Sequence, residues 1–265
     1  MKRTVTFAEQ VEEISDIPLP HRCTWSNKEQ ILDAISVNFD AFRFSCQELR
    51  SEKTFVLQVV KICGKSLRYA DASLQDDEDV VLEAVTSHPH SLAWASTRLQ
   101  DSCAIVTEAV RRDGLALMDA SSRLQDCMDV VQVAIEQNPH SVRFASSRLV
   151  RQPVVGIMAV SRQGLALSHL WDLRANREVV LAAVRNNGMA LQDAQRELRC
   201  DKEIALEAVQ SDPNAIVFVD ECLKRDGSEC VVVAVRGNYR LATYFPNHKM
   251  ALLEAIKINP AAFRY

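Results

Sequence analysis

Cysteine and histidine are the residue types in this chain that could bind a metal or form a nucleophile and base pair. The cysteines contain no C-x-x-C pair, and the histidines do not lie near them at the spacing of metal ligands. We therefore predict no structural zinc site. Scattered cysteines in a chain of this size indicate reduced, buried side chains of an intracellular protein. The eight cysteines are Cys23, Cys46, Cys63, Cys103, Cys127, Cys200, Cys222 and Cys230.

Catalytic groups are equally scattered. An enzyme needs a pocket with convergent polar side chains, but no Ser/His/Asp or Cys/His set recurs together and no glycine-rich phosphate loop is present. His88 and His90 flank Pro89 in a predicted turn, where a solvated histidine is the ordinary occupant. We predict a non-enzymatic protein that uses no cofactor.

The N-terminal segment carries a short pattern that could dock a partner. Arg3, Val5 and Phe7 resemble the docking motif of regulators of the type-one protein serine/threonine phosphatase, a basic residue followed by Val-x-Phe. The resemblance implies an extended strand added to a sheet edge, with Val5 and Phe7 on the same side. The alternative is that Val5, Phe7 and Val11 fold back and cap the first repeat.

Aromatic side chains recur at intervals close to 25 residues and form the other candidate binding surface. We call this set of positions the ladder. Seven of its ten members are aromatic, although only 6% of the chain is aromatic. The ladder positions are Phe44, Tyr69, Trp94, Asp119, Phe144, His169, Asp193, Phe218, Tyr244 and Tyr265.

Arginines lie four residues after three ladder positions, at Arg98, Arg123 and Arg148. On a continuous helix such residues are neighbours, so Trp94 would stack on Arg98, Phe144 would stack on Arg148, and Asp119 would pair with Arg123. This predicts a groove lined by aromatic and arginine side chains that binds a peptide of a protein partner.

Two other interpretations of the ladder stay open. The aromatics could fill the wedge between successive repeats, with the arginines pairing with acids such as Asp101 and Asp126. RNA-reading helical repeats also place one stacking side chain per repeat. The net charge of −4 and the acids beside the ladder argue against nucleic acid as the partner.

A repeat of about 25 residues must position these side chains. A small residue followed by a branched one recurs from Ala34-Ile35 to Ala255-Ile256, in steps of 25 residues with few exceptions. Such a period is the signature of a solenoid. We predict an all-α solenoid of about ten tandem two-helix repeats over residues 26–265, after an extended or disordered tail at 1–25.

The third copy illustrates the predicted repeat. A first helix runs from about Asp77 to Thr86, a break follows at Pro89, and a second helix runs from Ser91 to about Leu99. The break carries Gly or Pro in eight copies, because Gly adopts left-handed torsions at a helix end and Pro cannot continue a helix. The first helix of the chain starts with Ser26 as N-cap and Glu29 at the third position. The sixth copy is one residue short, which predicts a local irregularity at Leu170–Leu173.

The phrase REVVLAAVRNNGMALQDAQRELRCDKEIALEAV, residues 177–209, resembles the short helical repeats catalogued as domain of unknown function forty-one-sixteen. The resemblance covers about residues 28–260 and implies tandem two-helix repeats with no known activity. No apolar run approaches the ~20 residues that span a bilayer, and no secretory signal precedes the repeats. We predict a cytoplasmic or nuclear protein that does not bind membranes and acts as an interaction scaffold.

Overall fold

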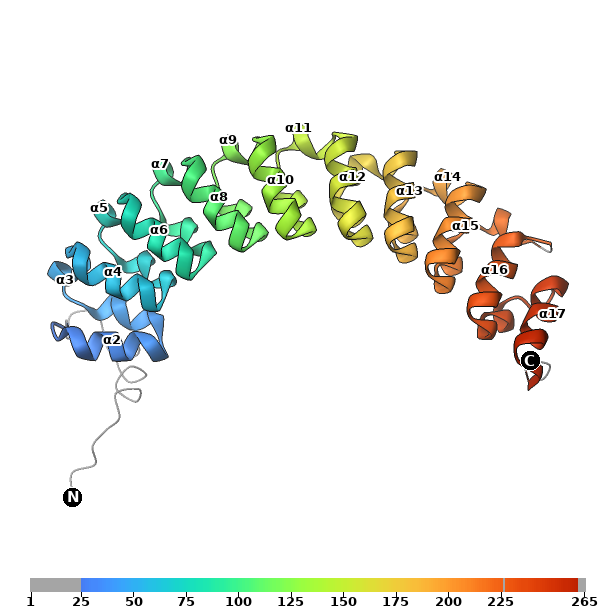
Figure 1. The fold of residues 1–265 in the computed structure, drawn as a ribbon, viewed down its shortest axis with the longest axis horizontal. Helices are drawn as coiled ribbons and strands as arrows, with labels where there is room; N and C mark the ends of the chain where they lie inside the picture. The colour runs from blue at the N-terminus through green and yellow to red at the C-terminus, as the bar shows by residue number, and fades with distance from the viewer. Residues whose placement is uncertain (1–24, 226, 262–265) are drawn as a thin grey trace, which may run out of the picture. The chain divides into compact units, whose positions relative to one another are not determined.

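A computed structural model of the chain describes residues 25–225 and 227–261. The chain groups into two compact units, Met1–Gln137 and Asn138–Tyr265, and the described part of each is a stack of helices (Figure 1). No β-strand forms in these two described ranges, which confirms the predicted all-α repeat class. That residues 26–265 form one continuous solenoid stays a prediction.

Each repeat of the first unit contains a ten-residue α-helix, a six-residue 3-10 helix and a short α-helix. The long helices are α2 (Lys28–Val37), α4 (Lys53–Ile62), α6 (Glu78–Ser87), α8 (Cys103–Arg112) and α10 (Met128–Gln137). The 3-10 helices are η2 (Phe39–Phe44), η3 (Gly64–Tyr69), η4 (Pro89–Trp94) and η5 (Gly114–Asp119). The short helices are α3 (Gln47–Ser51), α5 (Ala72–Gln75), α7 (Thr97–Gln100) and α9 (Ser122–Gln125).

The second unit repeats this order with some substitutions among the short helices. Its long helices are α12 (Pro153–Arg162), α13 (Arg177–Asn186), α15 (Lys202–Ser211), α16 (Glu229–Gly237) and α17 (Lys249–Ile258). The 3-10 helices that follow the turns are η6 (Pro139–Phe144), η7 (Gly164–His169), η9 (Gly188–Asp193), η10 (Pro213–Phe218) and η12 (Tyr239–Tyr244). The short elements are α11 (Ser147–Val150), η8 (Trp171–Leu173), α14 (Arg196–Arg199) and η11 (Glu221–Leu223).

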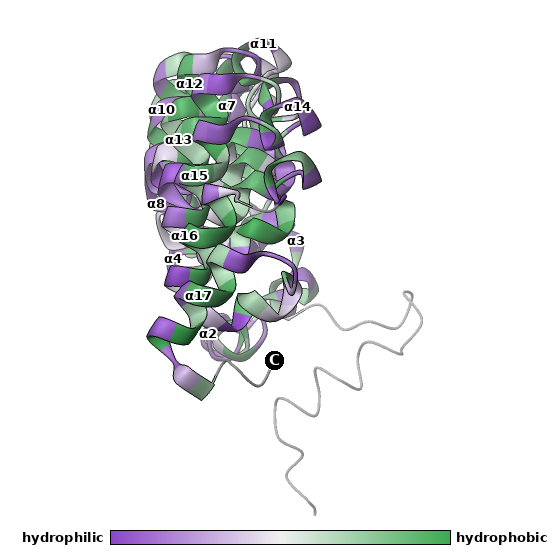
Figure 2. Ribbon diagram, turned by 90° about the vertical axis from the view of Figure 1, so that its right-hand side faces the viewer, coloured by the Kyte–Doolittle hydropathy of each residue, from purple (hydrophilic) through white to green (hydrophobic). Residues whose placement is uncertain are grey.

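The long helices form as the periodicity predicts. The Asp77 carboxylate caps α6 by accepting the backbone N–H groups of Asp79 and Val80, which have no partner inside the helix. The helix then buries Val80, Val81, Ala84 and Val85 on one stripe. Its observed bounds are one residue away from the predicted ones. Figure 2 shows apolar and polar residues side by side on long helices such as α15 and α16.

The prediction of one continuous second helix in each repeat is wrong, because the segment forms two separate helices. Between η4 and α7, Ala95 and Ser96 are extended, with ψ of 159° and 155°. Ser96 then caps α7 by accepting the N–H of Leu99, and the Gln100 side chain donates to the carbonyls of Leu92 and Ala93 near the end of η4. Both pieces still bury their leucine, so the leucine spacing resembles that of one helix.

The glycines in the turn are required for close packing and not for left-handed torsions, which corrects the prediction. Among the described residues only Gly227 has a positive φ. A Cβ on Gly64 or Gly188 would collide with the backbone carbonyl of Ala84 or Ala208, on the long helix of the next repeat. The small residue therefore lets one repeat approach the next.

The first helix begins one residue later than predicted. Asn27, not Ser26, is the N-cap of α2, because its side-chain oxygen accepts the N–H of Gln30. Trp25 is the last residue of the predicted tail. Its backbone N–H donates to the Phe44 carbonyl at 2.8 Å, and its ring centroid lies 5.8 Å from that of Phe44. Trp25 thus covers the end of the first repeat.

Repeats stack through two layers in each unit. Each long helix packs on the next one, as α4 does on α6 and α13 on α15, and each 3-10 helix packs on the next one, as η3 does on η4 and η9 on η10. The apolar core lies between the layers. The predicted irregularity of the sixth copy is present, since η8 replaces the short α-helix there. Within residues 25–225 and 227–261, none of the helices has the length and apolar character needed to cross a bilayer.

Candidate partner-binding surface

Every described ladder residue is the last residue of a 3-10 helix. That position faces the junction between repeats, so most ladder side chains are partly covered. Phe44 is buried, with 7% of its surface exposed, and Tyr244 is the opposite extreme at 75%. The half-buried members are Tyr69, Trp94, Asp119, Phe144, His169, Asp193 and Phe218.

Three ladder side chains bind a residue 29 positions earlier, in the preceding repeat. Tyr69 donates its hydroxyl to Asp40, Asp119 lies 2.8 Å from His90 Nδ1, and His169 Nε2 lies 3.0 Å from His140 Nδ1. Each partner is the second residue of its own 3-10 helix. These contacts support the interpretation in which ladder side chains connect successive repeats, and the 29-residue offset is a signal that sequence reasoning missed.

Burial changes the titration of these ladder groups. Burial and then the hydrogen bond to Asp40 raise the pKa of Tyr69. Burial raises the pKa of Asp119, and the contact with His90 opposes that rise. Burial, followed by the positive charges of His140 and Arg143, lowers the pKa of His169.

The predicted pairing of ladder residues with arginines four positions later is wrong. The extended residues Ala95 and Ala145 interrupt the helix on which Trp94 and Arg98, or Phe144 and Arg148, would have been neighbours. Arg98 instead binds Asp76 at 2.9 Å and Glu78 at 2.9 Å.

Arg123 is also engaged by the preceding repeat. Its Nε lies 2.9 Å from Asp101, whereas Asp119 is bound to His90. The interpretation in which arginines pair with capping acids therefore describes Arg98 and Arg123 correctly. Arg148 lies exposed on α11.

In most repeats the residue immediately before the ladder position faces solvent. Arginines occupy it in three repeats and lie over the next ring, with guanidinium-to-centroid distances of 4.6 Å for Arg43 on Phe44, 5.7 Å for Arg68 on Tyr69 and 4.6 Å for Arg143 on Phe144. The arginine–aromatic stacking therefore exists, but between sequence neighbours. The recurrence of arginine at positions 43, 68 and 143 is the sequence signal that could have located it.

An apolar hollow of about 300 Å³ lies between η10, η11 and η12 of the second unit. The ladder residue Tyr244 lines it, and so does Val217, which directly precedes the ladder residue Phe218. Val217 is 64% exposed and Tyr244 75% exposed, so two large apolar side chains border the same opening. The remaining lining residues are Ile216, Glu221, Lys224, Leu241 and Phe245.

Two charged residues that line this hollow, Glu221 and Lys224, bind each other. Lys224 Nζ lies 2.9 Å from the Glu221 carboxylate and donates to the Val217 carbonyl at 3.2 Å. Only 12% of the Lys224 side chain is exposed. An apolar centre with a paired charged rim is the composition of a protein-interaction site.

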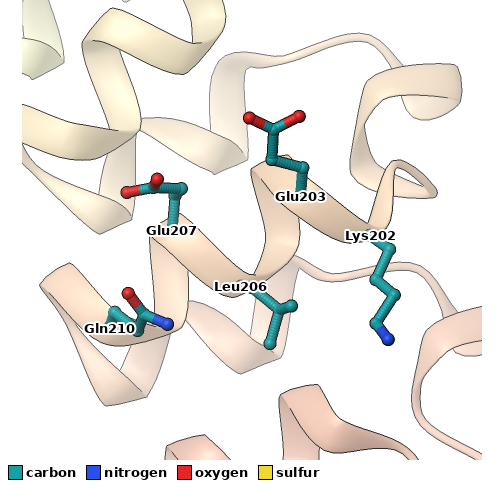
Figure 3. Close-up of a pocket in the computed structure, with 5 residues that line it drawn as sticks. All are labelled: Lys202, Glu203, Leu206, Glu207 and Gln210. Atoms are coloured by element: carbon teal, nitrogen blue, oxygen red, sulfur yellow. The ribbon is translucent and has the colours of Figure 1, made fainter.

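A second hollow, of about 400 Å³, lies on one face of α15 and is lined by Lys202, Glu203, Leu206, Glu207 and Gln210 (Figure 3). Glu207 pairs with Arg185 at 3.0 Å, Lys202 with Glu229 at 3.0 Å, and Glu203 with Arg177. These charges link α15 to the repeats on either side, so this face serves the stacking of repeats.

Four sequence-predicted site residues lie outside the described part of the chain. They are Arg3, Val5 and Phe7 of the tail motif and the last ladder residue, Tyr265.

A known family covers most of the repeats. Residues 52–100, 104–150, 157–199 and 176–224 match the model described as Domain of unknown function (DUF4116), and together they span more than half of the chain. The chain belongs to the DUF4116 family. Each DUF4116 match spans nearly two of the 25-residue repeats, and the family description names no activity. No curated protein and no solved structure matches the chain.

Proposed function

We propose that this chain is a non-enzymatic protein-interaction scaffold and that the hollow between η10, η11 and η12 receives an apolar side chain of a protein partner. The observation that carries the proposal is the joint exposure of Val217 and Tyr244 at one opening. A large aromatic beside an apolar hollow is the arrangement found at the energetic centre of protein interfaces.

The size of the hollow limits how tightly it binds on its own. Burial of one Val, Leu or Phe side chain stabilises a complex by about 1.5–3 kcal/mol, and association itself has a cost of at least several kcal/mol. A partner must therefore make further contacts. Exposed residues that directly precede ladder positions offer such contacts on the layer of 3-10 helices. They include Gln192 on η9 and Thr243 on η12.

Protein fits this surface better than RNA does. RNA readout would need several stacking side chains with unpaired cations beside them. Arg98 and Arg123 are bound to acids of the preceding repeat, and Lys224 is bound to Glu221. These three cations are thus neutralised within the chain, and the arginines directly before the ladder already lie over ladder rings.

A second proposal concerns the N-terminal segment, which could direct the repeats to a type-one serine/threonine phosphatase through Arg3, Val5 and Phe7. The sequence motif alone supports it. Titration calorimetry with the purified phosphatase catalytic subunit tests it, because Val5→Ala with Phe7→Ala should abolish the binding heat while Val11→Ala should not.

The experiment for the hollow is selection of random peptides displayed on phage against the purified chain. We expect enrichment of peptides with an aromatic or leucine anchor, and we expect Val217→Ser with Tyr244→Ala to weaken their binding by more than tenfold. Met118→Ser is the control, because Met118 has the equivalent position on η5 and is 51% exposed. Peptides that bind both variants as tightly as the wild type would refute the proposal.

A further inference from the structure

Two thiols and a carboxylate from neighbouring repeats converge at one point of the second unit. Cys200 follows the short helix α14, while Asp220 and Cys222 belong to the start of η11. The two Sγ atoms and a carboxylate oxygen all lie within 4.8 Å of one another. It is the one group of metal-ligand type within residues 25–225 and 227–261.

The same three positions hold a different set of side chains elsewhere in the chain. At two junctions of the first unit, an aspartate after a short helix is bound by a serine 20 residues later and by an arginine 22 residues later. The members are Asp76 with Ser96 and Arg98, and Asp101 with Ser121 and Arg123.

Cys200, Asp220 and Cys222 have the same spacing of 20 and 22 residues. The aspartate–arginine pair found at those positions in the first unit is replaced here by side chains that can ligate a cation, and Arg196 pairs with Asp220 from another position of the same junction. A backbone hydrogen bond of 3.1 Å from Asp220 N–H to the Arg199 carbonyl keeps the two repeats in register there.

The donor atoms suit a zinc-like ion. Thiolate ligands select soft or borderline cations over Mg²⁺ or Ca²⁺. Ligands at 2.3 Å for sulfur and about 2.1 Å for oxygen around a tetrahedral Zn²⁺ are separated by about 3.4–3.8 Å. Atoms that already lie within 4.8 Å reach this spacing through small side-chain rotations, and Cys222 is exposed and able to rotate.

We propose that Cys200, Asp220 and Cys222 bind a divalent cation of the zinc class, which links the two repeats that contribute the ligands. Three protein ligands leave one tetrahedral position for water. The three side chains converge at the positions that hold aspartate, serine and arginine at the two junctions of the first unit.

The surroundings hold the carboxylate in place and balance its charge. Asp220 Oδ2 lies 3.1 Å from Arg196 Nε, and Asp220 Oδ1 accepts the backbone N–H of Cys222 at 3.1 Å. The carboxylate is therefore oriented before the cation arrives.

The exchange of ions is balanced. Two neutral thiols and one carboxylate carry a charge of −1, and two thiolates, one carboxylate and Zn²⁺ also carry −1. Binding therefore releases two protons per ion at pH values below the thiol pKa values.

Titration of the full chain with Co²⁺, under argon and with a phosphine reductant, tests the proposal. We expect one Co²⁺ per chain, a sulfur-to-cobalt charge-transfer absorption, and displacement of Co²⁺ by Zn²⁺. Cys200→Ser and Cys222→Ser should abolish the absorption, and Asp220→Asn should weaken affinity by at least about tenfold. Cys103→Ser, which removes an exposed thiol from α8, should change nothing.

A second measurement guards against variants that misfold. Zn²⁺ should raise the Tm of the wild type and of Cys103→Ser, but not that of Cys222→Ser, because only a native-state ligand stabilises the fold. Absence of the charge-transfer absorption in the wild type would overturn the proposal. Absorption that persists in Cys222→Ser would also overturn it. A third contrary result would be a reduced chain that binds no Co²⁺ and whose two thiols form a disulfide when oxidised glutathione is added.

Discussion

Replacement of Gly188 by alanine tests how closely successive repeats approach. The added Cβ would lie under 3.0 Å from the Ala208 carbonyl oxygen, 2.9 Å from the Asp212 amide nitrogen and 3.1 Å from the Ala208 carbonyl carbon. All three atoms are backbone. Because the Asp212 N–H donates to the Ala208 carbonyl at 2.9 Å, the end of α15 cannot move aside without loss of that bond.

Three terms set the expected size of the effect. Overpacking costs about 1–3 kcal/mol, and a weakened hydrogen bond costs about 0.5–1.5 kcal/mol. Alanine also restricts the unfolded chain, which stabilises the fold by about 0.4–1 kcal/mol. We expect a net loss of about 2 kcal/mol, which corresponds to a fall in Tm of roughly 4–8 °C for a chain of this size.

Thermal and urea unfolding, followed by circular dichroism, measure this loss. Gly64→Ala should behave in the same way in the first unit, because its Cβ would meet the Ala84 carbonyl. Gly227→Ala is the contrasting variant, since its Cβ meets nothing within 4 Å and only its φ of 80° opposes the change. A stabilised Gly188→Ala protein would show that the glycine serves the turn alone and would refute the packing argument.

Three smaller effects follow from single contacts. In the fold, His169 has a pKa below its ordinary value of 6.5, so the unfolded chain binds more protons near that pH. The free energy of unfolding should therefore fall as the pH drops below about 6.5 toward the folded pKa. His169→Gln should lessen this pH dependence in urea titrations at several pH values. Gln100→Ala should cost about 1 kcal/mol in the same assay, because the Leu92 and Ala93 carbonyls each lose a side-chain donor at 3.2 Å. Arg123→Ala should cost less than about 1 kcal/mol, and high salt should reduce the difference from the wild type, because the pair with Asp101 is largely exposed.

The repeat and its long helices could be predicted from the sequence because they depend on local periodicity. The stripe of Val80, Val81, Ala84 and Val85 defines α6 without reference to any other repeat. The break at Ala95 could not be predicted in this way, because Leu92 and Leu99 are both buried and mimic one helix. What separates the two pieces is the Ser96 cap and the carbonyls bound by Gln100.

Side-chain contacts between repeats depend on offsets that no single repeat displays. The ladder residue Tyr69 binds Asp40 at an offset of 29 residues, and Cys200 meets Cys222 at an offset of 22. Neither offset equals the repeat of 25 residues, because the partners occupy different positions of consecutive repeats. Spacing rules for adjacent metal ligands therefore passed over the cysteine pair.

The proposed function requires that the face around Tyr244 contacts a protein partner. The most direct test places the photo-reactive residue p-benzoylphenylalanine at position 244 of the full chain, irradiates cells that express it, and analyses adducts by mass spectrometry. The same residue at position 118 serves as the comparison. We expect a discrete protein adduct at position 244 that is absent at position 118. Identical adducts at both positions, or none at position 244, would contradict it.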